Sequence, residues 1–337
     1  MLVASALFDD GLLLTRTWWP ARPAEPLVCV ISLVTPNLLL PDAKKPSGML
    51  PYATFTTEQN LAWARAHGYA YTLVLRSLYN GSSTGSMRPG VVWSKPRAVG
   101  LLLSGELASC DFALHLDGDA VVHAVGTSLA PLLTAYFART ATQALFASHG
   151  SMGVANRALP NIRAVQQARQ LCECMRVMAT CNASELAAMP ESCTHVNSGV
   201  YVVRNSEHAR RMLRWWAGGG GEANECGLLK LGGWEQKCCE LVRARWPQHV
   251  DIVHSLVLNA REDGSGLCLN SSNHYFACHA YGVEEGARAT IFGAEFSARK
   301  AELRALVAGR GEAYVRIEEV RRTALASLPP LPLVPHA

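Results

Sequence analysis

Phe112-Ala113-Leu114-His115-Leu116-Asp117-Gly118-Asp119-Ala120 is the stretch of the chain that decides the fold. An almost continuous apolar run leads into two carboxylates one residue apart, and apolar residues resume at Ala120. Such a run predicts a buried strand, and ligands bind at the carboxyl ends of strands in open α/β sheets. Buried carboxylates are costly unless a positive charge neutralises them. We therefore expect a divalent cation at Asp117 and Asp119, Mn²⁺ or Mg²⁺, because these ions prefer oxygen ligands.

Strand-like and helix-like segments alternate on both sides of this stretch. Strands are predicted at 27–34, 69–75, 112–116, 144–147, 199–203, 251–253 and 275–278. Helices are predicted at 56–66, 94–107, 129–137, 161–189, 207–216, 234–246 and 298–326. A capping box at Thr56-x-x-Gln59 begins the first helix, and Gly68 follows its end. The alternation predicts an α/β fold, with a mostly parallel sheet and helices on both faces.

Length and composition favour one large domain. The chain has 337 residues, 49% of them hydrophobic, and residues 26–326 are predicted to form the domain. Residues 1–25 are predicted to be poorly structured or truncated, because their apolar start contains two aspartates and fits neither a signal peptide nor a spanning helix. Residues 327–337 are predicted to be a Pro-rich tail. The net charge of +4 comes from scattered arginines, which argues against nucleic acid as a partner and favours a small acidic ligand.

Cysteines and glycosylation sequons favour an oxidising compartment. Nine of the eleven cysteines lie within 172–278, and the odd total leaves at least one without a partner in the chain. The sequons begin at Asn80, Asn182 and Asn270. The alternative for the cluster at 172–193 is a zinc site, although its Cys-x-Cys start departs from the usual ligand spacing. The pairing of the cysteines stays open.

Three further segments place polar groups at the ends of predicted elements. Asn197-Ser198-Gly199 is a polar turn before an apolar strand, where Gly199 would let a ligand approach the backbone. Glu235-Gln236 lies at the start of a predicted helix, and the alternative is a solvated helix face. His279 follows a predicted strand and offers an imidazole that could complete a metal site, although a single histidine there is more often an ordinary polar residue.

In this order the motifs resemble those of retaining galactosyl-, xylosyl- and mannosyltransferases of the galactomannan galactosyltransferase and xyloglucan xylosyltransferase type. Those enzymes have the Rossmann-like GT-A fold of nucleotide-sugar transferases. The likeness covers residues 27–282. It rests on His67-Gly68-Tyr69, Lys95, Leu116-Asp117-Gly118-Asp119-Ala120, Asn197-Ser198-Gly199-Val200-Tyr201, Glu235-Gln236 and His279-x-x-Gly282.

The resemblance implies a role for each matching residue. Asp117, Asp119 and His279 would hold the metal against the two phosphates of a nucleoside-diphosphate sugar. Gln236 would lie near the anomeric carbon and Glu235 would bind sugar or acceptor hydroxyls, as the catalytic pair. The implied donor-binding residues are Ser32, Lys95, Asp117, Gly118, Asn197, Ser198, Gly199 and Gly282.

The resemblance also implies a reaction and a location. A hexose or pentose would pass to a glycan or glycoprotein with retention of configuration and without a protein nucleophile. The implied location is the Golgi lumen or another part of the secretory pathway, with membrane association through an anchor missing from this sequence. Members of the family usually carry an aspartate where Glu235 stands.

Two other functions are compatible with parts of the pattern. Asp117-x-Asp119 matches the nucleophile loop of haloacid-dehalogenase-type phosphatases, but that loop normally follows the first strand, and two predicted strands precede it here. A non-catalytic sugar-binding module of the same fold would need the same pocket without turnover. The complete set of Asp117, Asp119 and His279 argues against that module.

Overall fold

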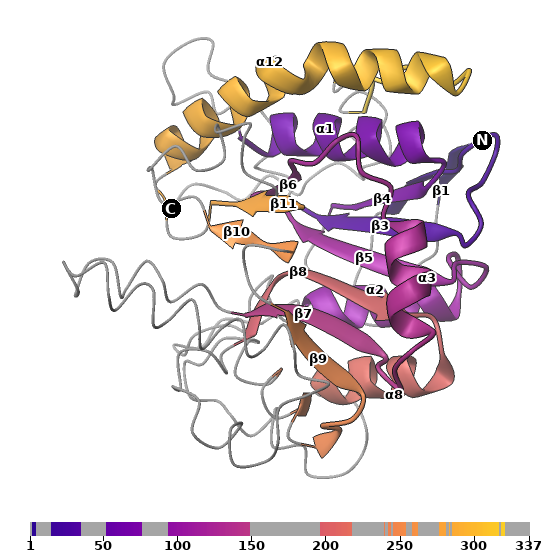
Figure 1. Cartoon of the computed structure of the whole chain (residues 1–337). Helices are drawn as coiled ribbons and strands as arrows, with labels where there is room; N and C mark the ends of the chain where they lie inside the picture. The colour runs from indigo at the N-terminus through magenta and orange to yellow at the C-terminus, as the bar shows by residue number, and fades with distance from the viewer. Residues whose placement is uncertain are drawn as a thin grey trace, which may run out of the picture.

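The computed structural model describes residues 2–4, 15–34, 52–75, 94–148, 196–217, 239, 242–243, 245–253, 258–261, 276–280, 283, 285–316 and 318–320. Its strands are β1 (Leu2–Ala4), β2 (Thr15–Trp18), β3 (Val28–Leu33), β4 (Ala70–Val74), β5 (Phe112–Asp117), β6 (Ala120–Val122), β7 (Ala144–Ser148), β8 (Val196–Arg204), β9 (Val250–Val253), β10 (Ala260–Arg261) and β11 (Ala277–His279). Its helices are α1 (Tyr52–His67), α2 (Ser94–Ser104), α3 (Ala130–Phe137), α8 (Glu207–Trp216) and α12 (Glu285–Gly309). Figure 1 shows their arrangement.

A mixed sheet forms the centre of the molecule, with the strand order β1-β2-β4-β3-β5-β8-β7-β9. β3 pairs in parallel with β4 and β5, and β7 pairs in parallel with β9. β2 and β8 are each antiparallel to both of their neighbours, so these two strands run against the other six. The predicted mostly parallel sheet is confirmed, with these two strands reversed. A small second sheet has the order β10-β11-β6.

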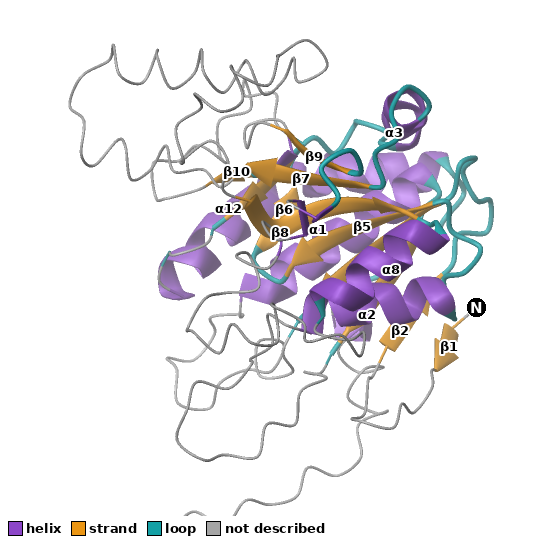
Figure 2. Ribbon diagram, turned by 90° about the horizontal axis from the view of Figure 1, so that it is seen from below, coloured by secondary structure: helices purple, strands orange, loops and turns teal. Residues whose placement is uncertain are grey.

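Helices cover both faces of the central sheet, as predicted. α1 and α12 pack together on one face, and α2 and α8 pack together on the other (Figures 1 and 2). Successive residues of β3 alternate between the two cores: Val28 and Val30 face α1, while Cys29 and Ile31 face α2 and α8. Burial on both faces explains why β3 is apolar except at Ser32.

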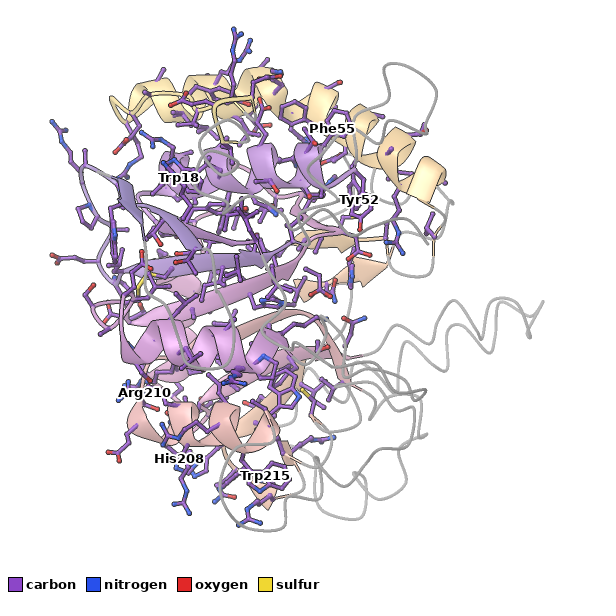
Figure 3. All side chains as sticks on the ribbon, turned by 180° about the vertical axis from the view of Figure 1, so that it is seen from behind. Trp18, Tyr52, Phe55, His208, Arg210 and Trp215 are labelled. Atoms are coloured by element: carbon purple, nitrogen blue, oxygen red, sulfur yellow. A yellow bond between two sulfur atoms is a disulfide. The ribbon has the colours of Figure 1, made fainter. Side chains whose placement is uncertain are left out.

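Aromatic side chains join α1 to α12. Tyr52 and Phe55 extend from α1 toward α12 (Figure 3). The ring of Tyr52 lies 6.3 Å from that of Phe292, and the ring of Phe55 lies 6.0 Å from that of Phe296. These contacts fix α12 over α1, and Thr56 of α1 in turn bonds to Gly118 in the turn that follows β5.

Two helix starts differ from the prediction. α1 begins at Tyr52, so Thr56 lies inside the helix and the predicted capping box is wrong. The Thr56 hydroxyl instead donates to the carbonyl oxygens of Ala53 and Gly118. α12 begins at Glu285, well before the predicted start at 298. Gly68 follows α1 with a φ of 72°, the left-handed conformation expected of a glycine after a helix.

The first 25 residues contribute two strands to the edge of the sheet. β2 pairs with β4, and the hydroxyls of Thr17 and Thr72 are hydrogen-bonded at 2.8 Å. The prediction of poor structure in this segment is therefore wrong for β1 and β2, which are held by strand pairing. No helix within the described ranges is long and apolar enough to span a membrane.

Cys29 of β3 and Cys110, just before β5, form a disulfide. Both cysteines are buried in the core beneath α2 and α8. Cys278 of β11 is also disulfide-bonded. The cysteine cluster at 172–193, the predicted helix at 161–189, the three sequons and the tail at 327–337 lie outside the described residues.

Candidate metal centre

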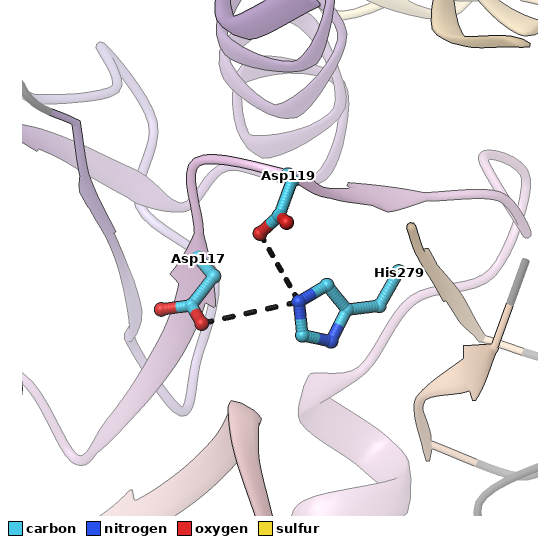
Figure 4. A group of neighbouring side chains, drawn as sticks. All are labelled: Asp117, Asp119 and His279. Carbon is cyan, nitrogen blue, oxygen red and sulfur yellow. Dashed lines mark hydrogen bonds and ion pairs between the residues drawn. The ribbon is translucent and has the colours of Figure 1, made fainter. Parts of the chain in front are cut away.

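Asp117, Asp119 and His279 meet at the carboxyl end of the central strand β5 (Figure 4). Asp117 is the last residue of β5, Asp119 lies in the turn before β6, and His279 ends β11. His279 Nε2 lies 3.1 Å from Asp119 Oδ1 and 3.9 Å from Asp117 Oδ2. One ligand atom from each residue lies within 4.8 Å of the other two. The predicted meeting of these three side chains is confirmed.

Strand pairing and one glycine bring His279 to the two aspartates. β11 pairs with β6 so that His279 lies opposite Ala120, and the Ala280 N–H donates to the Asp119 carbonyl at 3.0 Å. The imidazole lies against the backbone of Gly199. A Cβ at residue 199 would be only 2.0 Å from His279 Cε1. Gly199 therefore makes room for the His279 ring, a more specific role than the predicted approach of a ligand to the backbone.

Polar side chains of α1 hold the turn and strand that follow Asp117. Asn60 donates to the Ala120 carbonyl and accepts from the Val122 N–H, and Gln59 donates to the Val122 carbonyl. Thr56 donates to the Gly118 carbonyl at 2.7 Å. These bonds explain why α1 carries so many buried polar residues.

Two basic residues hold the Asp117 carboxylate. Lys95 Nζ donates to Oδ2 at 2.7 Å, and His115 Nε2 lies 3.0 Å from Oδ1. Burial alone would raise the pKa of Asp117, but the Lys95 charge, the His115 hydrogen bond and the charges of His115 and His279 together hold this pKa well below its usual range. Asp117 is therefore ionised at neutral pH.

Arg288 of α12 holds the Asp119 carboxylate from the other side. Its Nη1 lies 3.1 Å from Asp119 Oδ2, and its guanidinium lies 5.4 Å from the centre of the Tyr52 ring. Burial and the neighbouring Asp117 charge favour a protonated Asp119, while His279 and Arg288 oppose them and leave the pKa of Asp119 lowered. Arg288 contacts Oδ2 and leaves Oδ1 on the side of His279.

This set of side chains fits a divalent cation. The two ionised carboxylates are ligands suited to Mn²⁺ and to Mg²⁺, which accept a few protein ligands and leave positions for water and phosphate, and His279 adds an imidazole nitrogen. Lys95, His115 and Arg288 orient the carboxylates from behind, as outer groups do in metal sites.

The other predicted site residues are only partly placed. Asn197, Ser198 and Gly199 begin β8 beside this centre, and Gly118 forms the turn within it. Ser32 is buried in β3 opposite Leu116. Glu235, Gln236 and Gly282 lie outside the described residues. Sequence reasoning missed His115, Asn60 and Arg288. His115 stands two residues before Asp117 and could have been noticed, but nothing local marks the other two.

Comparison with known proteins finds likeness in structure alone. No protein-family model matches the sequence, and neither does any curated protein. A glycosyltransferase involved in glycosylating the major capsid of PBCV-1 is 14% identical over 80% of this chain and 99% of that chain, with a TM-score of 0.47. The bifunctional glycosyltransferase WbbM is 9% identical over 85% of this chain and 53% of its own, with a TM-score of 0.44. Mouse xyloside xylosyltransferase 1 is 11% identical over 68% of this chain and 73% of its own, with a TM-score of 0.33. Because all three scores are below 0.5, the proposal below rests on the geometry of the site.

Proposed function

We propose that this chain is a metal-dependent, retaining glycosyltransferase that moves a hexose or pentose from a nucleoside-diphosphate sugar to a glycan or glycoprotein. The observation that carries the proposal is the cluster of Asp117, Asp119 and His279 at the carboxyl end of β5. In open α/β sheets this end of the strands is where ligands bind. The order of the sequence motifs supports the GT-A type and the retaining outcome.

The charge balance of the site supports a diphosphate ligand. Lys95 and Arg288 already pair with the two carboxylates, so the charges of these four residues balance, and an imidazole that ligates a metal ion is neutral. A bound dication would then make the site positive, which suits the diphosphate of a sugar nucleotide. When bound, the ion would supply Lewis-acid stabilisation of the departing diphosphate.

The chain's own residues bind and orient in this proposal. Lys95 and Arg288 hold the carboxylates that face the ion, and His279 is fixed by Gly199 beneath its ring. Gln236 near the anomeric carbon and Glu235 on sugar or acceptor hydroxyls complete the proposed catalytic pair. The buried Cys29–Cys110 disulfide supports a location in the Golgi lumen or elsewhere in the secretory pathway.

The test is turnover of a panel of UDP- and GDP-sugars with Mn²⁺, comparing wild type with Asp119→Ala. We expect wild type to release nucleoside diphosphate from one panel member and the variant to lose both turnover and Mn²⁺-dependent binding of UDP or GDP. Asp111→Ala is the matched control. Asp111 lies just before β5, at the end opposite the metal centre, and within the described residues its carboxylate accepts only from the Leu27 N–H. Unchanged turnover in Asp119→Ala would overturn the proposal.

A further inference from the structure

Asn197 and Asn259 are joined by their side-chain amides next to the metal centre. Asn259 Nδ2 donates to Asn197 Oδ1 at 2.8 Å, and both residues are buried. Asn197 is the second residue of β8, and Asn259 lies just before β10. Sequence reasoning placed Asn197 at the donor pocket by resemblance and did not single out Asn259.

The hydrogen bonds fix which way each amide points. The Gly199 N–H donates to Asn197 Oδ1 at 2.8 Å, so the oxygen of Asn197 must face that backbone group. The group that Asn259 directs at the same oxygen must then be its NH₂. Among the described residues, Asn197 Nδ2 and Asn259 Oδ1 have no hydrogen-bond partner. A donor on Asn197 and an acceptor on Asn259 are thus left over.

Three connections tie this amide pair to the metal centre. The N–H that orients Asn197 belongs to Gly199, on whose backbone the His279 ring rests. Asn259 precedes β10, in which Arg261 pairs with His279 of β11. In addition, Leu116 of β5 lies opposite Val200 of antiparallel β8, so the first residues of β8 lie at the end of β5 where Asp117 stands. Figure 1 shows β10 beside β11, with β8 below them.

We propose that Asn197 and Asn259 together bind one hydroxyl of the donor sugar. A hydroxyl is the sugar group that both donates and accepts, so a single one can donate to Asn259 Oδ1 and accept from Asn197 Nδ2. Each unmet buried amide group is unfavourable until it finds a partner, which favours a site that the ligand completes. Asn259 is thereby a specificity residue for the sugar. The inference rests on the proposed glycosyl transfer and adds the part of the donor that this pair recognises.

The experiment measures binding by calorimetry, with Mn²⁺, of UDP, GDP, UDP-glucose, UDP-galactose, UDP-xylose and GDP-mannose. For the sugar nucleotide that binds wild type best, a series of analogues that each lack one hydroxyl is then compared in wild type and Asn259→Ala. We expect one deoxy analogue to bind wild type about tenfold more weakly than the parent sugar nucleotide. Asn259→Ala removes one of the two contacts, so it should show a clearly smaller difference between that analogue and its parent, and it should bind the free nucleoside diphosphate as wild type does.

Controls separate this inference from the proposed function and from misfolding. Asn205→Ala removes a side chain that donates to the carbonyls of Ala108 and Cys110 at the other end of the sheet, and it should keep the wild-type tenfold difference. If Asn259→Ala does not fold, Asn259→Leu keeps a similar side-chain shape without either amide group, and should reduce the difference in the same way. A deoxy penalty of the same size in wild type and Asn259 variants overturns the inference alone. Failure of wild type to bind any nucleoside diphosphate with Mn²⁺ overturns the proposed function as well.

Discussion

At the scale of single residues, Gly199 sets the position of His279. Substitution of Gly199 by alanine would put a methyl group 2.0 Å from Cε1 of the imidazole, so the ring must shift from its present position beside the two aspartates. We expect Gly199→Ala to weaken Mn²⁺ binding by at least about tenfold, as displacement of an orienting group does in other metal sites. Calorimetric titration of the metal-free protein with Mn²⁺ measures the effect.

The matched control is Gly293→Ala in α12. There the added Cβ would lie 3.5 Å from the Phe55 ring, an ordinary contact, and alanine favours a helix more than glycine by about 1 kcal/mol. Gly293→Ala should keep wild-type Mn²⁺ affinity. Equal Mn²⁺ affinity in Gly199→Ala and wild type would mean that His279 is not a ligand.

At the scale of elements, α1 holds the turn that carries Asp119. Asn60→Ala would leave the Ala120 carbonyl and the Val122 N–H without their buried partner on α1. We expect the free energy of unfolding to fall by about 3 kcal/mol, since each unmet group contributes ~1–3 kcal/mol. Urea denaturation monitored by circular dichroism measures the loss. Thr134→Ala, which removes only a bond to the Ala130 carbonyl within α3, should change it by less than about 0.5 kcal/mol.

The carboxyl end of α1 contains a histidine that should make stability depend on pH. Burial and the nearby Arg310 lower the pKa of His67, against a hydrogen bond from its Nε2 to the Val125 carbonyl that raises it. Because the folded protein then binds this proton less readily than the unfolded chain, stability is greatest above the unfolded pKa of about 6.5 and is lost as the pH falls through the folded value.

His67→Gln tests this dependence, because glutamine can still donate to the Val125 carbonyl but does not titrate. Urea denaturation of both proteins at a series of pH values from 7.5 to 5 should show wild type losing stability relative to the variant toward the acid end. Parallel curves over this range would show that His67 titrates alike in the folded and unfolded chains.

The same elements show what sequence can and cannot predict. The bounds predicted for α8 match the structure because they follow from local signals: Ser206 caps the Ala209 N–H, and apolar residues recur at helical spacing. β3 and β5 are found because burial on both faces makes them mostly apolar. The early part of α1 was missed because Thr56 bonds to Gly118, a partner 62 residues away.

The residues of the candidate site also differ in whether a local sequence pattern marks them. Asp117 and Asp119 are recognisable because two carboxylates interrupt an apolar run. Arg288 and Asn259 are not, because each is an ordinary polar residue whose partner is distant in sequence and is brought close only by strand pairing and helix packing. A polar residue whose partner is distant in sequence does not contribute to a hydrophobic periodicity, so the sequence alone does not identify it.

At the scale of the whole molecule, one disulfide ties together two of the central strands. Cys29 in β3 and Cys110 before β5 close a loop with a sequence separation of 81 residues, which contains α1, β4 and α2. In the chain-entropy account, a crosslink closing a loop of this length restricts the unfolded chain and stabilises the fold by roughly 4 kcal/mol.

Urea denaturation of the double variant Cys29→Ala/Cys110→Ala should therefore show a loss of this order in the free energy of unfolding. The dependence of stability on urea should also steepen, because the unfolded chain without the crosslink exposes more surface. Chemical reduction is not an equivalent test, since Cys278 is disulfide-bonded too. A loss below about 1 kcal/mol with an unchanged urea dependence would show that the crosslink does not constrain the unfolded chain.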